Sequence, residues 1–315
     1  MVFVCLIPIF SATSITVTRE PAREVRNAPL RSTPDTPSFA PPGGEEPGAH
    51  GPRHPAEALT GCRVVRRGSG WATATMPVPT LRAGEEGTIG WMGALADVSA
   101  AQALVSHLPD GYGLRTANLR LDRLDGLPSA GSIATGHGES SGTVTRSGLS
   151  RSTLKDRDGR AFAICTGRFV AVPTVGVTTP PTGTDQHHAY RPDWLHEAIG
   201  VRDARAEADK ITLTIRPSSS VCNHLGIVHG GLHITLIDHV MCGVLSSTRP
   251  GHYELLDLSL VYHRPASLLA EPDLVLQAVI DRQGRRITTV TASITSRSGR
   301  ILTTAHGTFM PDGNV

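Results

Sequence analysis

The sequence predicts a tandem pair of related α+β domains, each with an antiparallel sheet wrapped around one long apolar helix. Three observations support this fold class. The chain contains two copies of the same series of landmarks. Each copy places a long apolar helix ahead of consecutive strands. A segment rich in proline and glycine precedes each copy, and the second of these segments separates the two copies.

The landmarks of the two copies recur at a nearly constant spacing. Asp97 and Asp238, each within an apolar helix, are 141 residues apart. Phe169 and Phe309, each in a final strand, are 140 residues apart. A nearly constant offset over this length is difficult to obtain by chance, so we infer a duplication.

The second copy has the clearer pattern of elements. A short helix is expected over 193–199, with Asp193 as its cap, and the alternating segment 210–217 predicts a strand. The apolar run 229–246 predicts a long helix. Four strands are then expected near 255–263, 274–281, 287–296 and 301–310. The first copy repeats this order, with its first strand over 70–77 and its helix over 89–108.

Composition shifts set the predicted boundaries. We expect a disordered tail over 1–58, a first domain over 59–173, a linker over 174–192 and a second domain over 193–315. The apolar start, Met1–Phe10, is shorter than the roughly 20 residues that span a bilayer and has no basic flank. A signal, an interfacial anchor and a loose tail all remain open for it.

Bulk composition narrows the class of partner and the compartment. The 315 residues have a formal net charge of +2 and no arginine- or lysine-rich face, so no nucleic acid partner is expected. Five scattered cysteines without a Cys-x-x-Cys pair predict reduced thiols in a cytoplasmic protein. We also expect no membrane partner.

The most informative segment runs from Asn223 to Asp238, "NHLGIVHGGLHITLID". His229 leads into Gly230 and Gly231, where a helix is predicted to begin. Backbone N–H groups at a helix start, with no Cβ in the way, can approach a developing oxyanion. An isolated Gly-Gly pair would more simply allow a loop to pack tightly.

This segment resembles the hotdog-fold thioesterases of the phenylacetate-pathway (PaaI-like) type. Their motif is an asparagine, a short loop, His-Gly-Gly and an acid nine residues after the histidine, which here gives Asn223, His229, Gly230 and Asp238. The resemblance implies two hotdog domains that form an intramolecular pseudo-dimer. It also implies hydrolysis of acyl-coenzyme A, without a metal or redox cofactor and with coenzyme A as part of the substrate.

The resemblance also implies a role for each residue of the motif. The glycine N–H after the histidine holds the thioester oxygen, and the asparagine helps to place substrate or water. The helix acid attacks the substrate or activates water, and a serine or threonine on the following strand assists.

Helix geometry adds a constraint on the acid. Gly230 and Asp238 are eight residues apart, or about 12 Å along one helix, so one carbonyl cannot contact both. The acid must therefore come from the helix of the other copy. Site one then combines the loop of the second copy with Asp97, and the repeat offset places Thr116 at its hydroxyl position.

Site two would pair Asp238 with the loop of the first copy. There the asparagine, histidine and first glycine are replaced by Arg82, Thr88 and Ile89, and the hydroxyl position is Leu255. We therefore expect one working site per chain, with Asp97 as its essential acid.

Each candidate has a structural alternative. A carboxylate in a helix as apolar as that of Asp97 is either functional or satisfied by a structural hydrogen bond. Asp238 can equally be a structural residue in an inactive site, and Thr116 can serve packing alone. His229 fits a structural hydrogen bond to the loop better than proton transfer. The i, i+4 pair His229 and His233 lacks a zinc signature, so no metal is expected.

Substrate contacts and competing functions complete the expectations. Arg264, Arg285 and Arg286 are candidates to bind the coenzyme A phosphates, and pseudo-dimers can associate into homo-oligomers. The same fold also hosts hydratases and dehydratases of acyl thioesters, and a non-catalytic acyl-coenzyme A binder is the remaining alternative.

Overall fold

A computed structural model describes residues 54–80, 89–124, 126–174, 199–248 and 253–311, which lie within one compact unit, Gly44–Val315. Met1–Phe10, most of the predicted tail, the predicted linker apart from its first residue, and all but the last residue of the predicted helix over 193–199 lie outside the described residues. The end of that tail is described: Pro55–Thr60 forms helix α1, with Ala56 buried. The described residues therefore include a helix that starts ahead of residue 59, our predicted start of the first domain.

The first half of the described chain carries six strands around one long helix. Its elements in order are α1, β1 (Arg63–Gly68), β2 (Trp71–Pro77), the 3-10 helix η1 (Gly90–Met92), α2 (Gly93–Val105), β3 (Tyr112–Arg123), β4 (Ile133–Ser140), β5 (Ser147–Lys155) and β6 (Ala161–Pro173).

The second half repeats this series within the described ranges. Its elements are β7 (Val201–Ala206), β8 (Lys210–Ile215), the 3-10 helix η2 (Ser219–Val221), α4 (Gly230–Thr248), β9 (Tyr253–Tyr262), β10 (Leu274–Gln283), β11 (Thr288–Ser296) and β12 (Ile301–Pro311). The sequence did not predict β1 and β7, because both are edge strands without the alternating burial that marks a half-buried strand.

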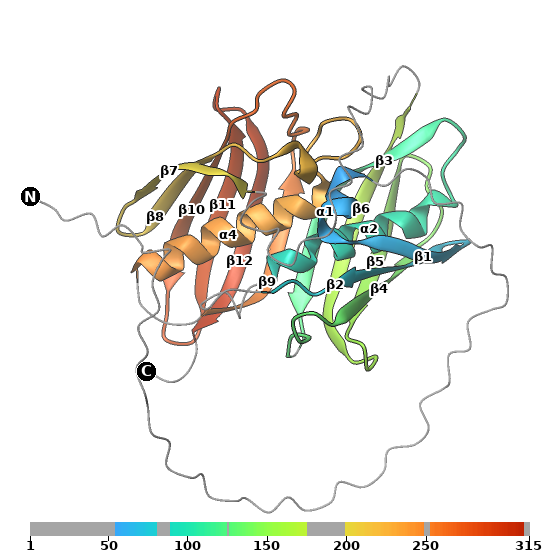
Figure 1. The fold of residues 1–315 in the computed structure, drawn as a ribbon, viewed down its shortest axis with the longest axis horizontal. Helices are drawn as coiled ribbons and strands as arrows, with labels where there is room; N and C mark the ends of the chain where they lie inside the picture. The colour runs from blue at the N-terminus through green and yellow to red at the C-terminus, as the bar shows by residue number, and fades with distance from the viewer. Residues whose placement is uncertain (1–53, 81–88, 125, 175–198, 249–252, 312–315) are drawn as a thin grey trace, which may run out of the picture. The chain divides into compact units, whose positions relative to one another are not determined.

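The twelve strands of the described ranges form one antiparallel sheet, in the order β1-β2-β4-β5-β6-β3-β9-β12-β11-β10-β8-β7. The order within the second half mirrors that of the first, and the halves join where β3 pairs with β9. Both long helices lie against the same side of this sheet (Figure 1). The predicted class, an antiparallel α+β fold with one long helix per half, is confirmed for the described residues.

Strand register identifies which residues of the two halves are equivalent. Thr116 pairs with Phe169, and Leu255 pairs with Phe309. An irregularity in the ladder follows both pairs, between Thr116 and Asn118 and between Leu255 and Asp257. The predicted match of Thr116 with Leu255 therefore agrees with the hydrogen-bonding pattern of the sheet.

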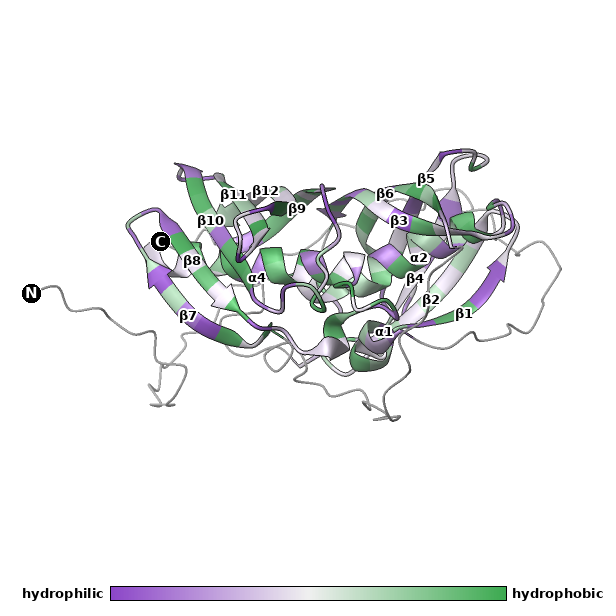
Figure 2. Cartoon of the chain, turned by 90° about the horizontal axis from the view of Figure 1, so that it is seen from above, coloured by the Kyte–Doolittle hydropathy of each residue, from purple (hydrophilic) through white to green (hydrophobic). Residues whose placement is uncertain are grey.

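The two long helices meet near their first turns, where both carry glycine. A Cβ on Gly93 would lie 2.2 Å from the Gly231 carbonyl oxygen, and a Cβ on Gly231 would lie 2.3 Å from that of Gly93. Only glycine permits this approach. Seen from above, the sheet curves around α2 and α4, and α1 lies on the open side near their contact (Figure 2). The start of each helix is therefore brought against the side of the other.

Candidate active site

Asp97 lies in the second turn of α2, where only 5% of its surface is exposed. The Thr116 hydroxyl donates a hydrogen bond to one carboxylate oxygen, with 3.1 Å between Oγ1 and Oδ1. The Gly231 N–H, from the start of α4, donates to the other, with 2.9 Å between N and Oδ2. The predicted pairing of an acid from one half with the glycine loop of the other is present in this geometry.

Burial changes the acidity of this carboxyl. Removal from water raises the pKa of Asp97 from 3.8 to about 6, against the opposing effect of the hydrogen bonds from Thr116 and Gly231. A carboxyl group with this pKa can accept a proton and release it again near neutral pH. The protonation state of Asp97 therefore changes within the range in which a general base works.

Gly230 and Gly231 are needed for different reasons. A Cβ on Gly230 would lie 2.7 Å from both the Asp97 Oδ2 and the Thr116 Oγ1, so a side chain there would displace the acid. Gly231 instead permits the close helix contact with Gly93 and donates to Asp97. We predicted a role only for the Gly230 N–H. The structure adds the Gly231 N–H, whose target is the acid itself.

His229 lies beside the acid as a neutral side chain. Burial lowers its pKa from 6.5 to about 4, so its 3.5 Å separation from the Asp97 Oδ2 is not a charged pair at neutral pH. Its Nδ1 accepts a hydrogen bond from the Gly231 N–H, with 3.2 Å between the nitrogens. The neutral ring therefore carries its proton on Nε2. This agrees with the predicted structural role of His229.

Asn223 holds the loop that leads to His229. Its side-chain oxygen accepts hydrogen bonds from the N–H groups of Leu225, at 2.9 Å, and Ile227, at 3.2 Å. The side chain also lines the cavity at the site. The side-chain oxygen is thus used to fix the loop, and a contact with substrate would fall to the amide nitrogen.

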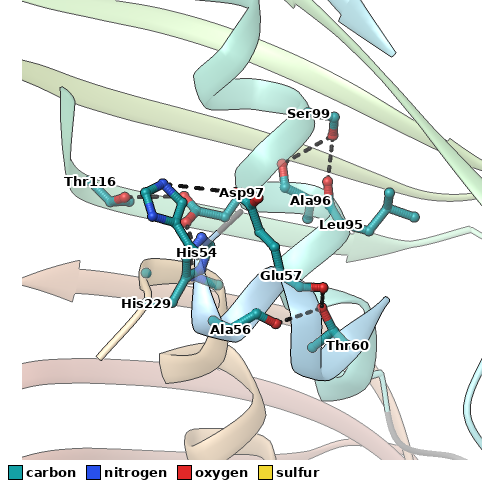
Figure 3. Close-up of polar contacts among 12 residues, drawn as sticks. His54, Ala56, Glu57, Thr60, Leu95, Ala96, Asp97, Ser99, Thr116 and His229 are labelled. Carbon is teal, nitrogen blue, oxygen red and sulfur yellow. Dashed lines mark hydrogen bonds and ion pairs between the residues drawn. The ribbon is translucent and has the colours of Figure 1, made fainter. Parts of the chain in front are cut away.

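Helix α1 and the residue before it contribute two side chains that sequence reasoning missed. His54 and Glu57 line the same cavity as Asp97, and the Ala56 N–H anchors α1 by donating to the Cys222 carbonyl at 3.0 Å. Figure 3 shows His54 and Glu57 beside Asp97, Thr116 and His229. The signal was Pro55, which follows His54 and suits the first position of a helix. We had assigned these residues to the tail.

His54 forms a pair with His224 at the edge of the site. Their Nδ1 atoms are 3.0 Å apart and their rings stack with centroids 4.8 Å apart. Burial first, and the nearby His229 and His224 next, lower the pKa of His54 to about 4. One ring of this pair must donate from Nδ1 and the other must accept, so both are held in fixed tautomers.

A cavity of about 780 Å³ extends from this cluster. Asp97, Thr116, Asn223, His229 and Gly230 all line it. Its volume is within the usual range for small-molecule sites. Five of the six predicted catalytic residues therefore gather at one cavity, and the sixth, Asp238, is not among its lining residues.

Asp238 occupies the matching position in α4. It is 3% exposed, and its Oδ2 accepts a hydrogen bond from the Gly90 N–H at 2.8 Å. Leu255, in the place of Thr116, and Ile89 are both fully buried. Arg82 and Thr88 lie outside the described residues. The second acid thus keeps the helix contact, and the Cys242 thiol also donates to its Oδ1 at 3.6 Å, but Leu255 replaces the hydroxyl that Asp97 has.

The three predicted phosphate-binding arginines do not gather in one place. Arg264 lines the Asp97 cavity, whereas Arg285 and Arg286 line a separate cavity of about 620 Å³ at the β10–β11 turn. Thr288, next to that turn, pairs with Phe309, and Phe309 pairs with Leu255 on the next strand. Leu255 holds the hydroxyl position of the second acid, Asp238, so this cavity lies toward Asp238. Of the three candidates, only Arg264 therefore lies at the Asp97 cavity. Sequence spacing does not reveal which end of the sheet a turn occupies, so it could not separate Arg264 from the other two.

Two further side chains, His233 and Cys222, are buried. The His233 Nδ1 lies 2.7 Å from the Thr303 Oγ1, and burial lowers the pKa of His233 to about 4. Burial raises the pKa of Cys222 to about 12, which makes this thiol a poor nucleophile. Among the described residues, no group of three potential metal ligands gathers. No helix in the described ranges is both long and apolar enough to cross a bilayer.

Comparison with known proteins supports the fold. Residues 225–303 match the model of the thioesterase superfamily. None of the curated proteins compared matches the chain.

Three solved structures illustrate the likeness. A conserved hotdog-fold protein of unknown function from Alicyclobacillus acidocaldarius has a TM-score of 0.57 at 14% identity, covering 84% of this chain and all of that chain (100%). An acyl-CoA thioesterase II from Mycobacterium marinum has a TM-score of 0.55 at 12% identity, covering 76% and 91%. A 12:0-ACP thioesterase from Umbellularia californica has a TM-score of 0.54 at 10% identity, covering 77% and 94%. The chain thus shares the hotdog fold found among thioesterases.

Proposed function

We propose that this protein hydrolyses acyl-coenzyme A thioesters at one composite site, built from α2 of the first half and the start of α4 of the second. One observation carries the proposal. Asp97, buried and with its pKa raised to about 6, is held between the Thr116 hydroxyl and the Gly231 N–H at the wall of a cavity. The two halves act in this proposal as a tandem hotdog pseudo-dimer.

The chemistry assigns a role to each group. In the general-base route, a water oxygen attacks the thioester carbonyl carbon while Asp97 takes the proton of the water. The thioester oxygen becomes an oxyanion, which the N–H of Gly230 at the helix start stabilises. Such a donor contributes about 3–4 kcal/mol to the transition state in enzymes where one has been removed. When the intermediate collapses, the C–S bond breaks and the leaving thiolate takes the proton back.

A covalent route uses the same residues. The Asp97 carboxylate attacks the carbonyl carbon, the thiolate leaves, and water then hydrolyses the mixed anhydride. Both routes require Asp97 to be ionised when the substrate binds. In both, Thr116 and Gly231 hold the two carboxylate oxygens in position, and neutral His229 fixes the loop through the Gly231 N–H.

The comparisons support the reaction class and leave the carrier to experiment. The thioesterase superfamily match includes the start of α4, and similar folds include a coenzyme A thioesterase and an acyl-carrier-protein thioesterase. We favour coenzyme A because Arg264 borders the cavity, where its guanidinium could meet an anionic carrier group. Acyl-carrier-protein substrates are the second arm of the test.

The decisive experiment measures thiol release from acyl-coenzyme A and acyl-carrier-protein substrates by the native chain, Asp97→Asn and Asp238→Asn. We expect Asp97→Asn to lose at least a hundredfold in kcat while still binding substrate, and Asp238→Asn to stay within a few-fold of native activity. Loss confined to Asp238→Asn would refute the assignment of the acid. No release from any thioester would refute hydrolysis and leave the binder or an acyl-thioester hydratase, which enoyl-coenzyme A would detect.

A further inference from the structure

One wall of the Asp97 cavity is an apolar stripe along α2. Val98, Ala101 and Val105 follow Asp97 at helical spacing, and all three line the cavity. Leu108, just beyond the helix, continues the stripe. Leu114 of β3 and Phe169 of β6 form the facing wall. We call these six side chains the apolar arm. Gln102, also at this wall, is half-buried and is its polar neighbour.

The two ends of the cavity differ in chemistry. Near α1 and the loop before α4 the lining includes the basic side chains His54, His224 and Arg264, among apolar residues of the loop. The apolar arm leads away from Asp97 in the other direction and ends at Val105 and Tyr112, whose exposed fractions are 36% and 43%. A thioester carbonyl at Asp97 would thus have a polar carrier on one side and an apolar group on the other.

The matching positions of the other half show that this stripe is not simply a property of the fold. The repeat offset of 141 residues relates Val98, Ala101 and Val105 to His239, Cys242 and Ser246 of α4. These side chains are more polar than those at the same positions of α2. The acid beside them, Asp238, lines neither of the two cavities described above. The apolar stripe therefore accompanies Asp97, which lines the cavity of about 780 Å³, and more polar residues stand at the matching positions beside Asp238.

We propose that the apolar arm binds the acyl chain of the substrate, and that the preferred substrate class is straight-chain thioesters of about eight to twelve carbons. This inference rests on the proposed hydrolysis at Asp97. It specifies the chain length, which the catalytic geometry by itself leaves open.

The length follows from the helix. Asp97 and Val105 are eight residues apart, which spans about 12 Å at about 1.5 Å per residue. An extended peptide covers about 3.6 Å with three bonds, so an extended alkyl chain covers about 1.2 Å per bond. The arm therefore holds about ten bonds before the chain reaches solvent at Val105. Longer chains gain nothing further from this wall.

The test is a chain-length series of straight-chain acyl-coenzyme A substrates from acetyl to palmitoyl, with thiol release as the readout. We expect kcat/KM to rise about fourfold for each buried methylene and to level off between about eight and twelve carbons. A series that is flat, or highest for acetyl, while the native chain still hydrolyses thioesters would overturn the acyl-arm inference and leave the proposed function standing. No release at any length would overturn the proposed function.

Two matched variants locate the chain along α2. Ala101 is one turn beyond Asp97, so Ala101→Phe should block the arm about five carbons from the carbonyl. We expect it to lose at least tenfold on decanoyl-coenzyme A and less than threefold on butyryl-coenzyme A. Cys242→Phe, at the matching position of α4, should keep the native length profile. Equal behaviour of the two folded variants would refute the inference.

Val105→Glu is a second, less disruptive variant that tests the same proposal if Ala101→Phe does not fold. Val105→Glu places a charge at the end of the arm, at a residue that is already 36% exposed. Activity on dodecanoyl-coenzyme A should fall about tenfold, and activity on hexanoyl-coenzyme A should not change. An unchanged ratio between these two substrates would show that the chain does not reach Val105, against the proposal.

Discussion

Asp97 and Asp238 occupy matching positions in the two halves, and each accepts a hydrogen bond from a glycine N–H near the start of the other long helix. At both sites a Cβ on a glycine, Gly230 or Gly90, would lie 2.7 Å from the carboxylate. The halves differ in what surrounds this shared contact. Thr116 and a cavity border Asp97, whereas buried Leu255 occupies the hydroxyl position beside Asp238.

This difference separates the fold from the chemistry. A carboxylate facing a helix start is stabilised by the N–H groups and the helix dipole, so the pair can persist for structural reasons alone. Catalysis additionally requires space for a substrate. It also requires a carboxyl group that hydrogen bonds keep in position but that can still accept a proton. In this chain the first requirement is met at Asp97, and the helix contact by itself is no evidence of catalysis at Asp238.

The largest difference between the two acids is expected when Gly230 and Gly90 are each replaced by alanine. Gly230→Ala forces a Cβ against Asp97 and Thr116, and we expect kcat to fall at least a hundredfold, because small displacements of a reacting group have large effects. Gly90→Ala makes the same clash with Asp238. It should destabilise the fold by about 1–3 kcal/mol but leave most of the activity.

Thiol release and thermal unfolding of both variants measure this contrast. Equal loss of activity, with both variants folded at the assay temperature, would mean that the second acid also takes part in turnover.

The next largest effect is expected on the free energy of unfolding, through the ionisation of Asp97. Because burial raises the pKa of Asp97 from 3.8 to about 6, the folded state binds its proton more tightly than the unfolded state. Ionisation of Asp97 therefore lowers stability as pH rises between these values, and the full cost, on the order of 3 kcal/mol, applies above pH 6. Asp97→Asn should be more stable than the native chain at pH 8 by up to this amount, and similar to it near pH 4.

Urea unfolding at the two pH values gives the measurement. A difference between native and Asp97→Asn that does not depend on pH would contradict the raised pKa.

The smallest effect is expected from the hydroxyl. Activity of the native chain should rise with pH through about 6, as Asp97 ionises, and then level off. Thr116→Val removes a hydrogen bond that lowers the pKa of Asp97, so the rise should move to higher pH and maximal kcat should fall about tenfold. Leu255→Thr, its counterpart, should change neither property. A profile of Thr116→Val identical to that of the native chain would exclude a role for this hydroxyl.

Several parts of the site could be predicted because they depend on local pattern. The offset between Asp97 and Asp238 matched Thr116 with Leu255, and the strand register agrees. The eight-residue separation of Gly230 and Asp238 predicted an acid from another helix, and Asp97 of α2 lies at the start of α4, where it accepts a hydrogen bond from Gly231. Helical rise and strand alternation are fixed by backbone geometry, so they carry over from sequence to structure.

Other parts depended on packing between distant segments. Pro55 and the polar composition around it gave no indication that α1 would pack against the loop at Cys222 and bring His54 to the site. The arginines near residue 285 lie toward the second acid, because the turn that carries them is placed by strand pairing. The positions of α1 and of this turn are decided by many weak contacts with other elements, and not by the residues of the segment itself.

The sequence by itself thus determined the repeat, the α+β class, the two helix acids and the inequality of their surroundings, since each follows from residue type and spacing. Only the tertiary structure decided that Gly231 donates to Asp97, that α1 borders the site, and that the stripe along α2 faces a cavity. The physical reason is that spacing fixes neighbours along one helix or strand. Contacts between elements depend on the close approach of α2 and α4 at two glycines and on the curvature of the sheet around them.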